Sequence, residues 1–207
     1  GIHGIVSITD NGTANRDIYV ESEQEIGGLL ESAGVDQVDY RTAIVNPLVR
    51  NEEILYQLNG MSMYSSTNTE EMWNFVKNMG FENLENRFQY AGSTEVMDML
   101  LGIRYLFCRN TRTLHTAYKK IAESQSFDLY ENPRALRSGY MVSDSVLDYA
   151  MEGTDPLEVQ NRLLSGIVGK RLYKMQTVNS DTALIGNTTF NIHLKKGEHG
   201  YLYIPGT

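Results

Sequence analysis

The stretch that decides the fold is Gly92-Ser-Thr-Glu-Val-Met-Asp-Met-Leu-Leu-Gly-Ile-Arg-Tyr-Leu-Phe107. Ser93 or Thr94 can cap a helix, because a hydroxyl there accepts hydrogen bonds from amides that the first turn leaves unpaired. Gly102 stands where a C-cap glycine belongs, since glycine enters the left-handed conformation without a steric penalty. Residues 103–107 are apolar or aromatic apart from Arg104, which is typical of a buried strand. The stretch therefore predicts a short buried helix, a glycine stop and a central strand.

Upstream, two more capping boxes precede apolar stripes at helical spacing, and each stripe ends at a glycine. Ser22 begins a predicted helix that ends at Gly34, and Thr67 begins one that ends at Gly80. Strands are predicted between these helices and after them, at residues 38–45, 53–58 and 88–91. The first half of the chain thus predicts a small sheet that carries helices.

Downstream of residue 112 the pattern becomes richer in strands. Residues 117–130 predict a hairpin, 137–142 a third strand, and Asp155-Pro156 the start of a helix that ends at Gly169. Further strands are predicted at residues 172–178, 188–194 and 200–204. We expect an α+β fold, a small mixed α/β layer followed by a partial β-sandwich. The expected organisation is a tether at 1–20, an α/β module at 21–112 and a β-rich module with one helix at 113–207.

The composition of the chain argues against several kinds of protein. The net charge is −8 and no basic block is present, which argues against nucleic acid as a partner. The single cysteine, Cys108, rules out an internal disulfide framework and a cysteine-based zinc site. The longest apolar run is too short for a membrane span, which takes about 20 residues. The absence of an initiator methionine and of a signal peptide leads us to expect a segment of a longer protein.

Several segments, taken in order, resemble the YfhO family of bacterial membrane proteins over roughly residues 36–145. They are Asp39-Tyr-Arg41, Leu58-Asn-Gly-Met-Ser-Met-Tyr-Ser-Ser66, Gly92-Ser-Thr94, Leu100-Leu-Gly-Ile-Arg-Tyr105, Leu129-Tyr-Glu-Asn-Pro-Arg-Ala-Leu136 and Gly139-Tyr-Met-Val142. Each motif alone occurs in many folds, and the ordered set carries the resemblance.

The resemblance implies an extracytoplasmic segment of a Gram-positive, multi-pass membrane protein related to GT-C type glycosyltransferases. Such enzymes take a sugar from a polyprenyl-phosphate carrier, and lipoteichoic acid glycosylation is the leading role that the family implies. Their catalytic carboxylates lie in the membrane block, so no catalytic residue is carried over to this chain. We expect this segment to be inactive alone, to need no cofactor, and to have the transmembrane block of the same polypeptide as its partner.

The most prominent polar cluster is Asn59-Gly60 with Tyr64-Ser65-Ser66. An amide, an aromatic face and hydroxyls suit a sugar or an anionic glycopolymer. Turn formation and helix capping are the simpler interpretation of the same residues.

Two arginines in strand patterns, Arg41 and Arg104, are further candidates for binding. A buried arginine needs a carboxylate or a set of carbonyls, and Asp39 or Asp98 could supply one. If both arginines instead face one open edge, they could hold a phosphate-containing polymer.

Other chemistries find less support. His193 and His199 lie six residues apart, but no third ligand accompanies them, so no metal site is predicted. A stand-alone hydrolase would need a nucleophile or a carboxylate pair that the sequence does not supply. The alternative to the glycosyltransferase interpretation is a non-enzymatic surface module that binds a glycan or a partner protein. The full gene separates the two, because a transferase parent should encode about a dozen hydrophobic spans of about 20 residues.

Overall fold

The computed structural model describes residues 16–84, 87–110, 118–148, 153, 155–174, 194–198 and 200–201. It divides into two compact units. The first holds the described residues up to Val76 and from Phe81 to Tyr140, and the second holds Lys77–Gly80 and the described residues from Met141 onward. The predicted α+β class is confirmed, since both helices and a mixed sheet are present.

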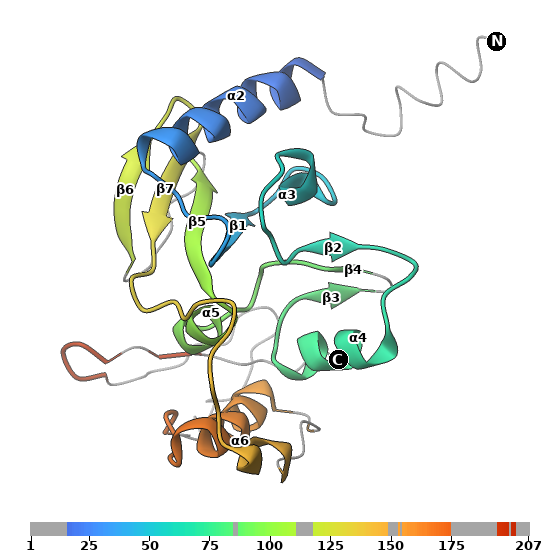
Figure 1. Cartoon of the computed structure of the whole chain (residues 1–207), viewed down its shortest axis with the longest axis vertical. Coiled ribbons are helices and arrows are strands. Elements are labelled where there is room, and N and C mark those ends of the chain that lie inside the picture. The colour runs from blue at the N-terminus through green and yellow to red at the C-terminus, as the bar shows by residue number, and fades with distance from the viewer. Residues whose placement is uncertain are drawn as a thin grey trace, which may run out of the picture. The chain divides into compact units, whose positions relative to one another are not determined.

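A four-stranded mixed sheet forms the centre of the first unit (Figure 1). The spatial order is β1-β5-β7-β6, with β5 parallel to β1 and antiparallel to β7. β6 and β7 form an antiparallel hairpin. The bounds are β1 Arg41–Val45, β5 Ile103–Arg109, β6 Lys119–Glu123 and β7 Phe127–Glu131.

Both faces of this sheet are covered. On one face, Ile26 and Leu29 of helix α2 (Arg16–Ser32) pack with Phe107 and Leu129 in a buried apolar cluster. Figure 1 shows α2 beside strands β6 and β7. On the other face, Ala43, Ile103 and Leu106 form a second cluster. Along β5, Tyr105 and Phe107 belong to the first cluster and Leu106 to the second, as the period of a strand requires. Ile103 departs from this alternation, because the pairing with β1 is irregular between Arg41 and Thr42.

The central stretch folds as its sequence predicts. Helix α5 (Glu95–Leu100) is capped by Thr94, whose hydroxyl accepts a hydrogen bond of 3.3 Å from the amide of Met97. Gly102 then adopts a φ of 69°, and a Cβ there would lie 2.8 Å from the carbonyl oxygen of Leu136. Glycine is therefore favoured at this position for two reasons, the positive φ angle and the lack of space for a side chain.

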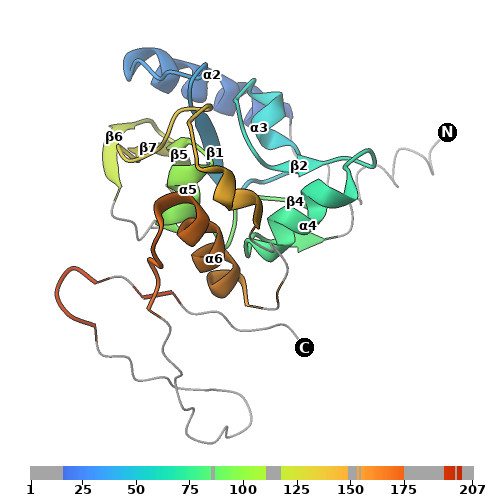
Figure 2. The same ribbon diagram turned by 60° about the horizontal axis from the view of Figure 1, so that its bottom comes forward.

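A second, three-stranded sheet lies in the same unit, with the order β2-β4-β3. Its short strands are β2 Met63–Tyr64, β3 Asn83–Leu84 and β4 Arg87–Phe88. Helix α4 (Glu70–Asn78) lies beside this sheet in both views (Figures 1 and 2). The predicted helix after Thr67 is confirmed, although Thr69 rather than Thr67 accepts the capping hydrogen bond, from the amide of Met72.

The second unit is built on helix α6 (Pro156–Val168), as the sequence predicts. The Asp155 carboxylate accepts hydrogen bonds from the amides of Leu157 and Glu158, and Gly169 ends the helix in the left-handed conformation. A 3-10 helix, η1 (Asp144–Asp148), packs on α6.

Several predicted elements differ in the structure. Residues 53–58 do not form a strand; residues 53–55 belong to helix α3 (Glu52–Leu55), at whose start both glutamates are buried and accept hydrogen bonds from backbone amides. Helix α2 begins at Arg16, so Ser22 is a buried residue inside the helix and not its cap. Residues 16–20 of the predicted tether therefore belong to that helix. The described residues 137–142 contain no strand.

The predicted module boundary after residue 112 lies between β5 and its neighbour β7. The hairpin of β6 and β7 completes the four-stranded sheet, so the boundary does not follow the sheet. Residues 171–174, at the start of the predicted strand 172–178, are not a strand in the structure. The remainder of that strand, most of the predicted strands 188–194 and 200–204, and residues 1–15 of the predicted tether lie outside the described residues.

Candidate functional site

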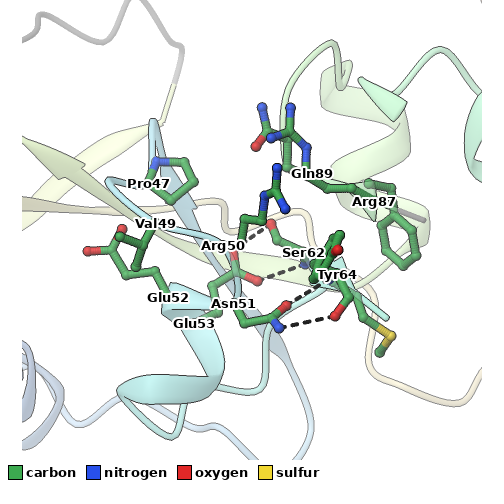
Figure 3. Close-up of a pocket in the computed structure, with 12 residues that line it drawn as sticks. Pro47, Val49, Arg50, Asn51, Glu52, Glu53, Ser62, Tyr64, Arg87 and Gln89 are labelled. Atoms are coloured by element: carbon green, nitrogen blue, oxygen red, sulfur yellow. Dashed lines mark hydrogen bonds between the residues drawn. The ribbon is translucent and has the colours of Figure 1, made fainter. Parts of the chain in front are cut away.

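A shallow depression in the first unit lies between the small sheet and the segment that follows β1 (Figure 3). It holds about 270 Å³ of space, open solvent at its mouth included. Tyr64, one of the residues singled out from the sequence, lies on its wall. The lining residues are Pro47, Val49, Arg50, Asn51, Glu52, Glu53, Ser62, Met63, Tyr64, Arg87, Phe88 and Gln89.

Two arginines stand at this depression. The guanidinium carbon of Arg50 lies 4.5 Å from the centre of the Tyr64 ring, a cation–π contact. Arg87 reaches Glu82 at 3.3 Å, and both side chains of this pair are partly exposed. Figure 3 shows the ends of the Arg50, Arg87 and Gln89 side chains extending toward the same side of the depression. The wall therefore offers planar N–H donors, an amide and an aromatic ring together.

Asn51 fixes the position of Tyr64. Its side-chain amide donates to the Tyr64 carbonyl oxygen at 3.1 Å and accepts from the Tyr64 amide at 2.7 Å. The Asn51 side chain thus makes the pair of hydrogen bonds that a neighbouring strand would make. Asn51 itself has a φ of 58°, a conformation that asparagine tolerates better than most residues. The rim is consequently held by bonds between side chain and backbone, before any ligand arrives.

Two adjacent carboxylates, Glu52 and Glu53, form the floor, and each is only 1% exposed. Glu52 forms an ion pair with Arg109 and also accepts from the hydroxyl of Tyr56 at 3.1 Å and the amide of Leu48 at 2.6 Å. These partners and its burial leave Glu52 no access to a ligand.

Glu53 is held by the backbone amides of Ile44, at 3.0 Å, and Ser62, at 2.8 Å, and by the Ser62 hydroxyl at 3.0 Å. Burial raises the pKa of Glu53, and these hydrogen bonds oppose the rise. The role of this side chain is to tie β1 and the turn before β2 to helix α3.

Asn59 and Gly60 serve that same framework rather than the depression. The Asn59 side chain donates to the carbonyl oxygens of Gln37, at 3.2 Å, and Tyr40, at 3.1 Å. A Cβ on Gly60 would lie 2.7 Å from the Cβ and Cδ of Glu53. Both residues therefore have structural roles in this framework.

Ser65 and Ser66 follow Tyr64 at the end of β2. The Ser65 hydroxyl lies 2.8 Å from that of Thr67 and accepts from the Thr67 amide at 3.2 Å, which makes a local turn. Ser66 is exposed. Neither serine lines the depression.

Arg41 and Arg104 are placed on the large sheet, away from the depression. Arg41 donates to the carbonyl oxygen of Leu101 at 2.5 Å. Arg104 pairs with Glu131, at 3.0 and 2.6 Å, and its guanidinium lies 4.6 Å from the centre of the Tyr40 ring. The partner of Arg104 is thus neither of the two aspartates that the sequence suggested.

Those two aspartates have other roles. Asp39 lies 3.4 Å from Arg137. Asp98, on α5, is buried and accepts hydrogen bonds from the hydroxyls of Ser93, Tyr90 and Tyr118 at 2.6, 2.9 and 2.6 Å. Both belong to the scaffold.

The structure therefore brings together a different set from the one that the sequence suggested. Of the seven predicted residues only Tyr64 lies in the depression, and Arg50, Arg87 and Gln89 join it from other segments. Antiparallel pairing of β2 with β4 places Tyr64 opposite Arg87. This pairing joins segments over 20 residues apart, and no local pattern in the sequence signalled it.

Metal binding finds no support within the described ranges, where no group of three or more His, Cys, Asp or Glu residues could hold an ion. His193 and His199 both lie outside the described residues. Cys108 is buried and 2% exposed.

Comparison with known proteins identifies the family to which the chain belongs. The sequence profile described as "Bacterial membrane protein YfhO" matches residues 3–199, which is nearly the whole chain. The chain therefore belongs to the YfhO family of bacterial membrane proteins, as its ordered motifs predict. Searches of curated proteins and of solved structures found no match. None of the helices in the described part of the chain is long and apolar enough to cross a membrane.

Proposed function

We propose that this chain is an extracytoplasmic segment of a multi-pass, glycosyltransferase-like membrane protein of a Gram-positive bacterium. The parent protein would decorate a cell-surface polymer, with lipoteichoic acid as the leading case, using a polyprenyl-phosphate sugar donor. The family match over residues 3–199 is the observation that carries this proposal. The segment would present the acceptor polymer to the transmembrane block of the same polypeptide, where the chemistry would take place.

The depression supports an accessory, non-catalytic role for the segment. Its exposed groups are arginines, an amide and a tyrosine, which bind and orient an anionic glycopolymer or a sugar. The carboxylates that general acid–base catalysis would need are Glu52 and Glu53, and both are buried and engaged by the protein. The depression therefore exposes groups that can contact a ligand, whereas its two carboxylates are buried.

The test uses a bacterial strain that lacks the gene. Restoring the full-length gene should restore the sugar content of lipoteichoic acid, measured per phosphate by NMR of the extracted polymer. A gene from which this segment has been deleted should fail to restore it, with the amount of membrane-inserted protein checked by immunoblot.

A second experiment addresses the segment alone. The purified 207-residue chain, given the lipid-linked sugar and the polymer, should transfer no sugar. Transfer by the purified chain, or an unchanged sugar content in the strain without the gene, would overturn the proposal.

A further inference from the structure

We infer that Arg50 and Arg87 form a clamp for one phosphodiester group, with Tyr64 and Gln89 contacting the polyol or sugar attached to it. This inference deepens the proposed function, on which its biological setting rests. The ligand class is a soluble, phosphodiester-linked polyol or saccharide.

The charges at the depression favour an anionic ligand. Among the described residues, no carboxylate pairs with Arg50, whose guanidinium is instead held against the Tyr64 ring at 4.5 Å. Arg87 pairs with Glu82 at 3.3 Å, and that glutamate side chain is nearly half exposed. The two carboxylates of the lining are buried, Glu52 in an ion pair with Arg109 and Glu53 in hydrogen bonds to backbone amides, so the charge exposed at this spot without an ion-pair partner is that of Arg50. This excess fits a monoanion better than a dianion.

The positions of the two arginines suit a ligand that accepts several hydrogen bonds. Arg50 and Arg87 line the same depression, and Figure 3 shows the ends of both side chains on the same side of it, where an oxyanion would accept from both. Guanidinium forks match the oxygens of a phosphate in two parallel hydrogen bonds. Gln89, beside Arg87, adds an amide.

The side chains of Tyr64 and Arg50 are held in place before a ligand binds. Asn51 clamps both backbone groups of Tyr64, and the ring in turn holds Arg50. Binding therefore costs less conformational entropy than it would with a mobile arginine. The depression is open to solvent, so the groups esterified to a phosphate held there would not have to be buried.

The experiment is an NMR titration of the isotope-labelled 207-residue chain. The probes are glycerophosphoglycerol as the diester, glycerol 1-phosphate as the monoester, and maltose as the neutral sugar. Vesicles of phosphatidylglycerol and of phosphatidylcholine test a lipid headgroup as the source of the phosphate. Saturable shifts on Arg50, Tyr64, Arg87 and Gln89 with the diester, weakened by salt, are expected.

Variants localise the effect. R50Q and R87Q should each weaken diester binding about tenfold, since each removes charge-assisted hydrogen bonds. R50K should fall between R50Q and the parent chain, because lysine keeps the charge but not the planar fork. R137Q is the matched control, because Arg137 is an exposed arginine that pairs with Asp39 and does not line the depression.

The inference is overturned if R50Q binds the diester like the parent chain, or if R137Q weakens binding as much as R50Q does. It is also overturned if only the monoester or only the anionic vesicles bind. The two proposals fail separately. If the titration shows no binding but deletion of the segment still lowers the sugar content of lipoteichoic acid, the clamp is ruled out and the proposed function stands. If the diester binds but deletion leaves the sugar content unchanged, the chain has a phosphodiester site without the proposed function.

Discussion

Gly60 lies directly against the buried side chain of Glu53, which leaves no room for a larger residue without movement of that side chain. A Cβ on residue 60 would come within 2.7 Å of the Cβ and Cδ of Glu53, which backbone amides hold in place on two sides. We expect Gly60→Ala to lower the free energy of unfolding by about 2 kcal/mol, a typical overpacking cost. Urea denaturation followed by tryptophan fluorescence measures the effect.

Gly139→Ala is the control for this prediction, since nothing lies within 4 Å of a Cβ at that position. Its unfolding midpoint should stay close to that of the parent chain. Equal midpoints for the two variants would show that Glu53 can move aside, and the floor of the depression would then be less rigid than we describe.

Asp98 gives the second prediction at the scale of single residues. Burial raises the pKa of Asp98, and the three hydroxyls that donate to it only partly offset this rise. When the pKa of a carboxyl is higher in the folded state than in the unfolded state, the protein loses stability as the pH rises from the unfolded pKa to the folded pKa. We expect Asp98→Asn to gain stability relative to the parent chain between about pH 4, the ordinary aspartate value, and neutral pH.

Thermal unfolding at a series of pH values checks this. The asparagine amide can still accept from Tyr90 and Tyr118 and donate to Ser93, so the variant should fold. Asp39→Asn, which removes a half-exposed carboxylate elsewhere in the same unit, controls for the change in net charge. A stability difference between Asp98→Asn and the parent chain that stays constant with pH would contradict the prediction.

At the scale of elements, helix α2 is attached to the β6–β7 turn through Glu25. This carboxylate accepts from the hydroxyls of Ser124 and Ser126, at 2.5 and 2.7 Å, and from the Ser126 amide at 2.7 Å. We expect Glu25→Gln to lower the free energy of unfolding by about 1 kcal/mol at neutral pH, because bonds to a charged acceptor are replaced by weaker ones.

The same variant has a pH signature. Burial alone would raise the pKa of Glu25, but the serine hydrogen bonds and the charge of Arg109 lower it overall. Stability from a depressed carboxyl pKa is present above the unfolded value and lost as the pH falls through the folded value. The gap between Glu25→Gln and the parent chain should therefore narrow below about pH 4.3. Glu23→Gln, on the exposed side of α2, should show no such gap.

Elements whose signals are local were predictable from the sequence. Thr94 and Gly102 mark the two ends of α5 and its turn, and Asp155 and Gly169 mark those of α6, because caps act within a few residues. Residues 53–58 could not be assigned correctly in this way. Their helix depends on carboxylates that find partners as distant as Arg109, and tertiary contacts of this kind override local preference.

The candidate site was predictable only in part, for the same reason. The polar cluster around Tyr64 is visible in the sequence, but Arg87 and Gln89 reach it through the pairing of β2 with β4. Strand pairing between distant segments leaves no periodic trace in a single sequence. Asn59 and Gly60 were singled out for residue types that often have purely structural roles, and the structure uses them for a side-chain hydrogen bond and for close packing.

At the scale of the whole molecule, the β6–β7 hairpin belongs with the first half of the chain. Its pairing with β5 completes the large sheet, and the second unit takes up the sequence only after Tyr140, apart from Lys77–Gly80. A change in composition after residue 112 is therefore a weaker guide to unit boundaries than sheet pairing, because a sheet buries its faces wherever its strands come from.

The side of the membrane on which the chain lies can be tested with one substitution in the full-length protein. Ser66 is exposed, and the single cysteine of this chain, Cys108, is buried. We expect Ser66→Cys to react with a membrane-impermeant maleimide in intact cells, after any cysteines of the parent outside this segment have been replaced. The parent protein with Cys108 alone is the control and should stay unlabelled, because a buried thiol is inert. If the introduced thiol is labelled only after the cells are opened, the segment faces the cytoplasm and cannot meet an acceptor polymer outside the membrane.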